Sequence, residues 1–157
     1  MTERNIGQIV QVIGPVVDVR FQPGKLPPIK SAVSINDVKK KISVVAEIAQ
    51  HLGNDTARCI AMSSTDGLVR SMEVLDDGGP ISVPVGKEVL GRIFNLLGKP
   101  IDTKEDFEAK NYLPIHRAPP SFEERETTTT VLETGLKVID LLAPFARGGK
   151  IGLFGGA

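Results

Sequence analysis

The chain has 157 residues with 19 basic and 19 acidic side chains, so its formal net charge at pH 7 is zero. This balance does not favour a nucleic-acid partner, because such binding depends on Lys and Arg side chains that neutralise phosphates. Hydrophobic residues make up 41% of the chain and aromatic residues only 4%. The length allows one ordinary domain, or a small domain with part of another, built around an aliphatic core.

Six short segments in the first 75 residues alternate or nearly alternate apolar and polar side chains between turns. In the second segment Val17, Val19 and Phe21 share one face, while Asp18 and Arg20 share the other. Strands of this length and spacing favour a closed antiparallel barrel, because closure removes the exposed edges of a small sheet. The six predicted strands cover residues 7–13, 16–21, 32–35, 42–50, 57–62 and 68–75.

The single cysteine, Cys59, excludes an internal disulfide and is consistent with a reducing compartment. Its apolar neighbours predict a buried, inert thiol. Residues 1–20 lack the basic and then apolar pattern of a signal peptide. No apolar run approaches the roughly 20 residues that span a bilayer. We therefore expect a soluble protein without direct membrane insertion.

The pattern changes after the turn at residues 76–80, so we predict a barrel domain over residues 1–79 and a second domain over residues 80–157. Apolar residues at helical spacing predict a helix over residues 89–97 that ends at Gly98. A second short helix signal covers residues 138–142. The lysine run at residues 39–41 is typical of a solvated turn.

The chain ends in a predicted buried strand, residues 150–154, followed by Gly155, Gly156 and Ala157. A phosphate-binding loop has the pattern G-x-x-x-x-G-K-[ST] and follows such a strand. These three residues match only its first three positions. Considered locally, an ordinary Gly-Gly turn is the stronger explanation, with a phosphate loop as the alternative.

Three longer segments change that balance, because they closely resemble the catalytic beta subunits of the rotary F-type ATP synthases. They are IGQIVQVIGPVVDVRF at residues 6–21, PISVPVGKEVLGRIFNLLGKPID at residues 80–102 and GLKVIDLLAPFARGGKIGLFGGA at residues 135–157. The resemblance is collinear from Gly7 to Ala157. It implies an all-β, six-stranded N-terminal barrel followed by the beginning of an α/β, RecA-like P-loop nucleotide-binding domain.

The same resemblance implies what the complete protein does. Family members bind ATP or ADP with Mg²⁺ and interconvert them by phosphoryl transfer, driven by proton flow and a central rotary shaft subunit. Their beta subunits alternate with alpha subunits in a hexameric ring, peripheral to an energy-transducing membrane. The family loop reads GGAGVGKT, of which this chain carries Gly155, Gly156 and Ala157 as nucleotide-binding positions. Ser71 stands where the family usually has Gly.

We therefore expect an N-terminal fragment with no catalytic and no metal-ligating residue of its own, which binds neither ATP nor Mg²⁺ tightly. We also expect residues 81–157 to be poorly ordered in the isolated chain. The loop lysine and threonine, the helix behind them and the downstream carboxylate and arginine positions lie outside this sequence.

Three other readings stay open: a vacuolar-type or flagellar export ATPase subunit, a noncatalytic alpha subunit, or a non-enzymatic barrel module for assembly. The KIGLFGGA ending argues against the alpha subunit. Two remote histidines, His51 and His116, do not favour a metal site. Asp140 is expected to cap or pair locally, and the threonine run at residues 127–130 is not interpreted as a phosphorylation site.

Overall fold

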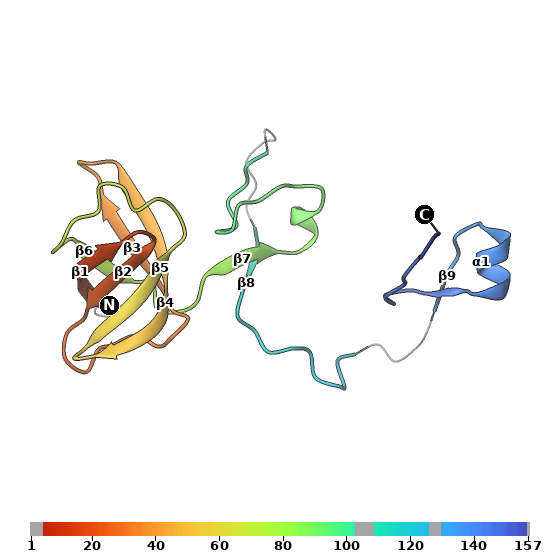
Figure 1. Cartoon of the computed structure of the whole chain (residues 1–157), viewed down its shortest axis with the longest axis horizontal. Coiled ribbons are helices and arrows are strands. Elements are labelled where there is room, and N and C mark those ends of the chain that lie inside the picture. The colour runs from red at the N-terminus through yellow and green to blue at the C-terminus, as the bar shows by residue number, and fades with distance from the viewer. Residues whose placement is uncertain (1–4, 103–108, 126–129, 157) are drawn as a thin grey trace. The chain divides into compact units, whose positions relative to one another are not determined.

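The computed structural model describes residues 5–102, 109–125 and 130–156 (Figure 1). It divides into two compact units, Met1–Arg117 and Ala118–Ala157. The domain boundary placed between residues 79 and 80 stays a prediction.

Six antiparallel strands of the first unit form a closed barrel in the order β1-β2-β5-β4-β3-β6 (Figure 1). The predicted barrel is therefore confirmed, with shifted ends for most strands. The sixth strand is the most shortened, because the residues before it form a turn. The strands are β1 (Ile6–Ile13), β2 (Val16–Arg20), β3 (Ala32–Asp37), β4 (Ile42–Gly53), β5 (Thr56–Ala61) and β6 (Glu73–Asp76).

The barrel interior is almost entirely aliphatic, as the composition predicts. Alternate residues of each strand face inward, so β4 contributes Val44, Ala46 and Ile48 while the residues between them face outward. Phe21 and Cys59 are the two members of the buried cluster that are not aliphatic. The buried cluster consists of Ile9, Val17, Val19, Phe21, Val33, Ile35, Val44, Ala46, Ile48, Ala57, Cys59, Leu68 and Val74.

Barrel closure depends on a short seam between β1 and β6. Ile6, Gly7 and Gln8 pair with Leu75, Val74 and Glu73 respectively. A Cβ at Gly7 would lie 2.8 Å from Val19 and 2.9 Å from Phe21, closer than real Cβ contacts allow. The pairing of β1 with β6 therefore requires glycine at position 7.

Ser71, the departure from the family pattern, has a left-handed backbone with φ of 68°. Its amide donates to the Ile9 carbonyl at 2.8 Å, which ties this turn to β1. Left-handed φ is disfavoured for residues with a Cβ, whereas glycine adopts it readily. The structure therefore explains why glycine suits this position.

The helix predicted over residues 89–97 is wrong. The segment contains a 3-10 turn, η1 (Lys87–Val89), and then an irregular loop with an isolated bridge between Phe94 and Pro100. Gly91, inside the predicted helix, has φ of 69°, which the interior of an α-helix cannot accommodate. Apolar residues at helical spacing thus belong to a compact glycine-containing loop.

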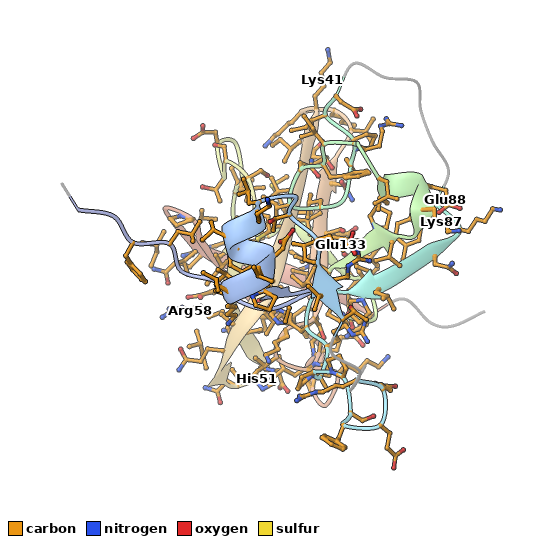
Figure 2. All side chains as sticks on the ribbon, turned by 90° about the vertical axis from the view of Figure 1, so that its right-hand side faces the viewer. Lys41, His51, Arg58, Lys87, Glu88 and Glu133 are labelled. Carbon is orange, nitrogen blue, oxygen red and sulfur yellow. The ribbon has the colours of Figure 1, made fainter. Side chains whose placement is uncertain are left out.

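A hairpin of β7 (Ser82–Val85) and β8 (Asn111–Pro114) flanks this loop in the sequence and was not predicted. At the β3–β4 turn, Lys41 is exposed and points away from the barrel (Figure 2), as expected for a solvated lysine run.

The second unit contains a small hairpin of β9 (Val131–Leu132) and β10 (Phe145–Ala146) around α1 (Lys137–Leu142). The predicted short helix is confirmed and ends before Pro144. The strand predicted at residues 150–154 is wrong, because residues 150–156 have neither helix nor strand structure. A strand requires a hydrogen-bonding neighbour, and the described residues provide none for this segment.

We expect Ser71→Gly to stabilise the protein by about 0.5–1 kcal/mol, because it relieves left-handed strain at some cost in backbone entropy. Ser43→Gly, the same change at an exposed β4 position, is the matched control. It should destabilise the protein by about 0.5–1 kcal/mol. Urea unfolding at unchanged slope measures both. Equal effects of the two changes would contradict the assigned backbone strain.

Candidate functional site

The predicted phosphate-loop residues lie at the exposed end of the second unit. Gly155 and Gly156 are exposed, and a Cβ added to either would meet no atom within 4 Å. Ala157 lies outside the described residues. The preceding Leu153 and Phe154 are 79% and 99% exposed. The structure therefore brings no described side chain to these glycines, and their assignment to a phosphate loop stays a prediction.

The best-formed polar network of the second unit surrounds Asp140, at the start of α1. Its Oδ1 accepts hydrogen bonds from the Thr134 hydroxyl at 2.6 Å and the Thr134 amide at 3.1 Å. Its Oδ2 accepts from the Gly135 amide at 2.9 Å. The hydroxyl bond is the main cause that lowers the pKa of this carboxyl. Asp140 thus pairs locally as predicted, and its role is to hold the residues before the helix.

An ion pair on the barrel joins β2 to β5. Arg58 donates through Nε and Nη2 to the two Asp18 carboxylate oxygens, at 2.9 Å each. This hydrogen bonding raises the pKa of Arg58 above its usual value. Asp18 is only 5% exposed although it lies on the predicted outer face. The paired geometry makes this a structural bridge between strands.

Cys59 lies in the barrel core, where burial and then the charge of Asp18 raise the pKa of its thiol to about 12. Because of this raised pKa, the thiol is protonated at physiological pH. Only a thiolate is a competent nucleophile or metal ligand, so the protonated thiol is unreactive. The predicted buried, inert thiol is confirmed.

A second bidentate pair closes the loop that follows β7. Arg92 donates to Asp102 at 2.7 Å through Nε and at 2.9 Å through Nη2. Their side chains are 11% and 9% exposed. Asp102 also accepts from the Ile93 amide at 3.4 Å. Both residues belong to the segment 80–102 on which the resemblance rests, and their arrangement indicates a structural role.

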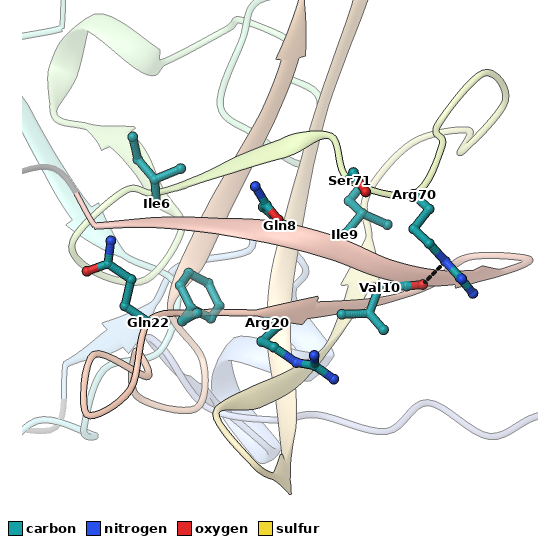
Figure 3. A pocket seen from close by; sticks show the side chains of 9 residues that line it. Ile6, Gln8, Ile9, Val10, Arg20, Gln22, Arg70 and Ser71 are labelled. Atoms are coloured by element: carbon teal, nitrogen blue, oxygen red, sulfur yellow. Dashed lines mark hydrogen bonds between the residues drawn. The ribbon is translucent and has the colours of Figure 1, made fainter.

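A surface groove with a volume of about 680 Å³ lies on the outside of the barrel (Figure 3). It is open to solvent and contains two guanidinium groups but no carboxylate. Arg70 is positioned by a hydrogen bond from its Nε to the Val10 carbonyl at 2.9 Å. We call this surface the arginine groove; its lining residues are Ile6, Gln8, Ile9, Val10, Arg20, Phe21, Gln22, Arg70 and Ser71.

Sequence reasoning missed the arginine groove, although strand alternation correctly placed Arg20 on the outer face. Arg70 comes from the turn before β6, so only barrel closure brings it beside β1 and β2. No group of three or more His, Cys, Asp or Glu that could hold a metal occurs among the described residues. No helix in the described part of the chain is long and apolar enough to cross a membrane.

We expect the amide resonances of Thr134 and Gly135 to move as the pH falls through the folded-state pKa of Asp140. Because that pKa is lowered, the stabilisation is present above the unfolded value of about 3.9 and is lost below the folded one. A pH titration by NMR measures this midpoint. Thr134→Val should raise it, because the hydroxyl bond is then absent. An unchanged midpoint in this variant would contradict the assigned cause.

The comparison with known families agrees with the architecture of the first unit. Residues 9–78 match the model of the ATP synthase alpha/beta family, beta-barrel domain. The match begins within β1, passes through all six strands of the closed barrel and ends just after β6. Residues 9–78 therefore fit the N-terminal β-barrel domain of ATP synthase alpha/beta family subunits.

Proposed function

We propose that the chain supplies the N-terminal part of the catalytic beta subunit of a proton-driven rotary ATP synthase, which makes ATP from ADP and phosphate or hydrolyses it in reverse. The observation that carries this proposal is the closed six-stranded barrel over the residues that match the family model. The collinear resemblance of residues 80–102 and 135–157 supports the catalytic subunit over other family members.

The second unit supports the proposal through its unburied apolar side chains. α1 has no buried residue, and the segment after β10 exposes further large apolar groups. Such side chains favour contact with additional structure, as in the beginning of a larger α/β domain. Those more than half exposed are Phe122, Val131, Leu136, Val138, Leu141, Leu142, Leu153 and Phe154.

The described residues do not fit Mg-ATP on their own. Gly155 and Gly156 could offer two backbone amides, whereas a phosphate loop also needs a lysine and a Ser or Thr hydroxyl for Mg²⁺. Open space surrounds both glycines. We therefore assign no catalytic residue to this chain and derive no chemical step from it.

For the barrel we propose an assembly role, in which it contacts alpha subunits of an alternating hexameric ring. The arginine groove supports this role, because two guanidinium groups without a carboxylate favour an acidic surface on a neighbouring subunit. Such a ring would lie peripheral to an energy-transducing membrane and surround a central rotary shaft subunit.

A vacuolar-type or flagellar export ATPase subunit is the alternative within the same architecture, and a barrel module for assembly alone is the non-enzymatic alternative. The codons after Ala157 in the gene discriminate between them. Codons for Gly-Val-Gly-Lys-Thr support the catalytic beta subunit, and a different loop would favour another ATPase. A stop codon would favour the assembly module.

We expect the 157-residue chain to bind Mg-ATP no more tightly than about 1 mM, because a charge-assisted hydrogen bond contributes about 1.5–3 kcal/mol and several are missing. Titration calorimetry with Mg-ATP measures this affinity, and phosphate release should stay at background. Saturable micromolar binding would show that a nucleotide site lies elsewhere in the chain. The matched control is Gly155→Ala/Gly156→Ala, which should leave this weak signal unchanged.

We also expect Arg20→Glu to weaken co-assembly with alpha subunits about tenfold, because it places a carboxylate in the arginine groove. Arg20 is exposed at the end of β2 and does not belong to the buried cluster, so folding should be preserved. Lys40→Glu makes the same charge change on the exposed β3–β4 turn and is the control. Native mass spectrometry of mixtures with alpha subunits measures both, and equal effects would argue against this interface.

A further inference from the structure

A histidine just after the β7–β8 hairpin contacts the outside of the barrel. Nε2 of His116 lies 2.7 Å from Oε2 of Glu47, which belongs to β4 and is 69 positions away in the chain. Their side chains are 34% and 19% exposed. Glu47 lies between the inward-facing Ala46 and Ile48, so strand alternation fixes its outward direction.

The two hairpin strands have few contacts with the barrel strands, although the Ala32 amide of β3 donates to the Gly79 carbonyl at 2.7 Å in the chain before β7. Among the described elements, β7 and β8 pack mainly against each other and, for β7, against η1. The chain between β6 and β7 contains Gly78, with φ of 79°, and Gly79. Beside His116, the Ile115 amide donates to the Ile81 carbonyl at 2.9 Å, which couples the histidine to the base of the hairpin.

We propose that His116 and Glu47 form a pH-sensitive latch that holds the β7–β8 hairpin against the barrel. A carboxylate only accepts hydrogen bonds, so Nε2 of His116 is the donor in this contact. Below the range in which histidine titrates, the donor is a cation and the bond is charge-assisted. Above that range a neutral imidazole donates a weaker bond. The latch is therefore tighter at pH 5.5 than at pH 8.

The surroundings of His116 contain three further charged side chains. Lys30, from the turn before β3, and Asp76, from β6, line a cavity of about 370 Å³ together with His116. Arg117 follows it in the chain. Lys, Arg and Asp side chains ordinarily keep their charge between pH 5.5 and 8. The protonation of His116 is therefore the change that the latch senses.

The chain offers a matched control, because it contains only two histidines. His51 lies on the same strand, β4, but its Nε2 lies 2.8 Å from the carbonyl oxygen of Pro27, in the loop between β2 and β3. Burial raises the pKa of Cys59 to about 12, which keeps that thiol silent in the window and unreactive toward labels. A response that requires His116 and not His51 identifies the latch.

The test places a nitroxide label on Ser43→Cys, an exposed β4 position on the same face as Glu47. Paramagnetic relaxation of the Leu113 and Ile115 methyl groups then reports how close the hairpin lies to the barrel in the full chain. Because a charge-assisted bond is stronger than a neutral one, we expect the unlatched population to rise about fivefold between pH 5.5 and pH 8.

Two near-isosteric variants should abolish this response. Glu47→Gln keeps an acceptor but removes the charge, and His116→Gln keeps a donor but cannot titrate. Both should show the weaker relaxation at each pH, whereas His51→Gln should behave as the parent does. The proposal is overturned by a parent protein with equal relaxation at both pH values, or by Glu47→Gln with an unchanged response. Loss of the response in His51→Gln alone would overturn it as well.

Discussion

Closure of the barrel at the seam between β1 and β6 is the constraint on which the first unit depends. Among the residues that the structure describes, three pairs form this ladder, and Gly7 stands in the middle of it. Its missing side chain leaves room for Val19 and Phe21, which pack directly beneath the strand. An open sheet would expose both its edges and its aliphatic interior. The seam therefore converts six short strands into one buried core.

Strand alternation carried enough information to predict the barrel, because nearly all inward positions are aliphatic and each turn is marked by glycine, asparagine or aspartate. It could not predict what closure brings together. Arg70 reaches Val10 across 60 positions of sequence, and the left-handed Ser71 follows from the same turn. The arginine groove thus arises from tertiary pairing, for which a single strand pattern gives no signal.

The failed predictions after the barrel have one physical cause. Helical spacing of apolar residues at 89–97 and a short apolar run at 150–154 describe side chains only, whereas backbone structure also needs hydrogen-bonding partners. In the first segment Gly91 and the Arg92–Asp102 pair direct the chain into a loop. In the second, no described neighbour pairs with the backbone. Local pattern succeeded at α1, where the hydrogen bonds lie within the segment and Asp140 fixes its start.

The two units differ in how completely their own residues bury their apolar side chains. In the barrel, apolar groups are buried and the Asp18–Arg58 pair is matched in charge and geometry. In the second unit, Leu153 and Phe154 face solvent immediately before Gly155. A phosphate loop works by holding backbone amides in a fixed ring, and that requires the strand before it to be anchored. The described residues leave Leu153 and Phe154 uncovered, so they do not hold Gly155 and Gly156 in such a ring.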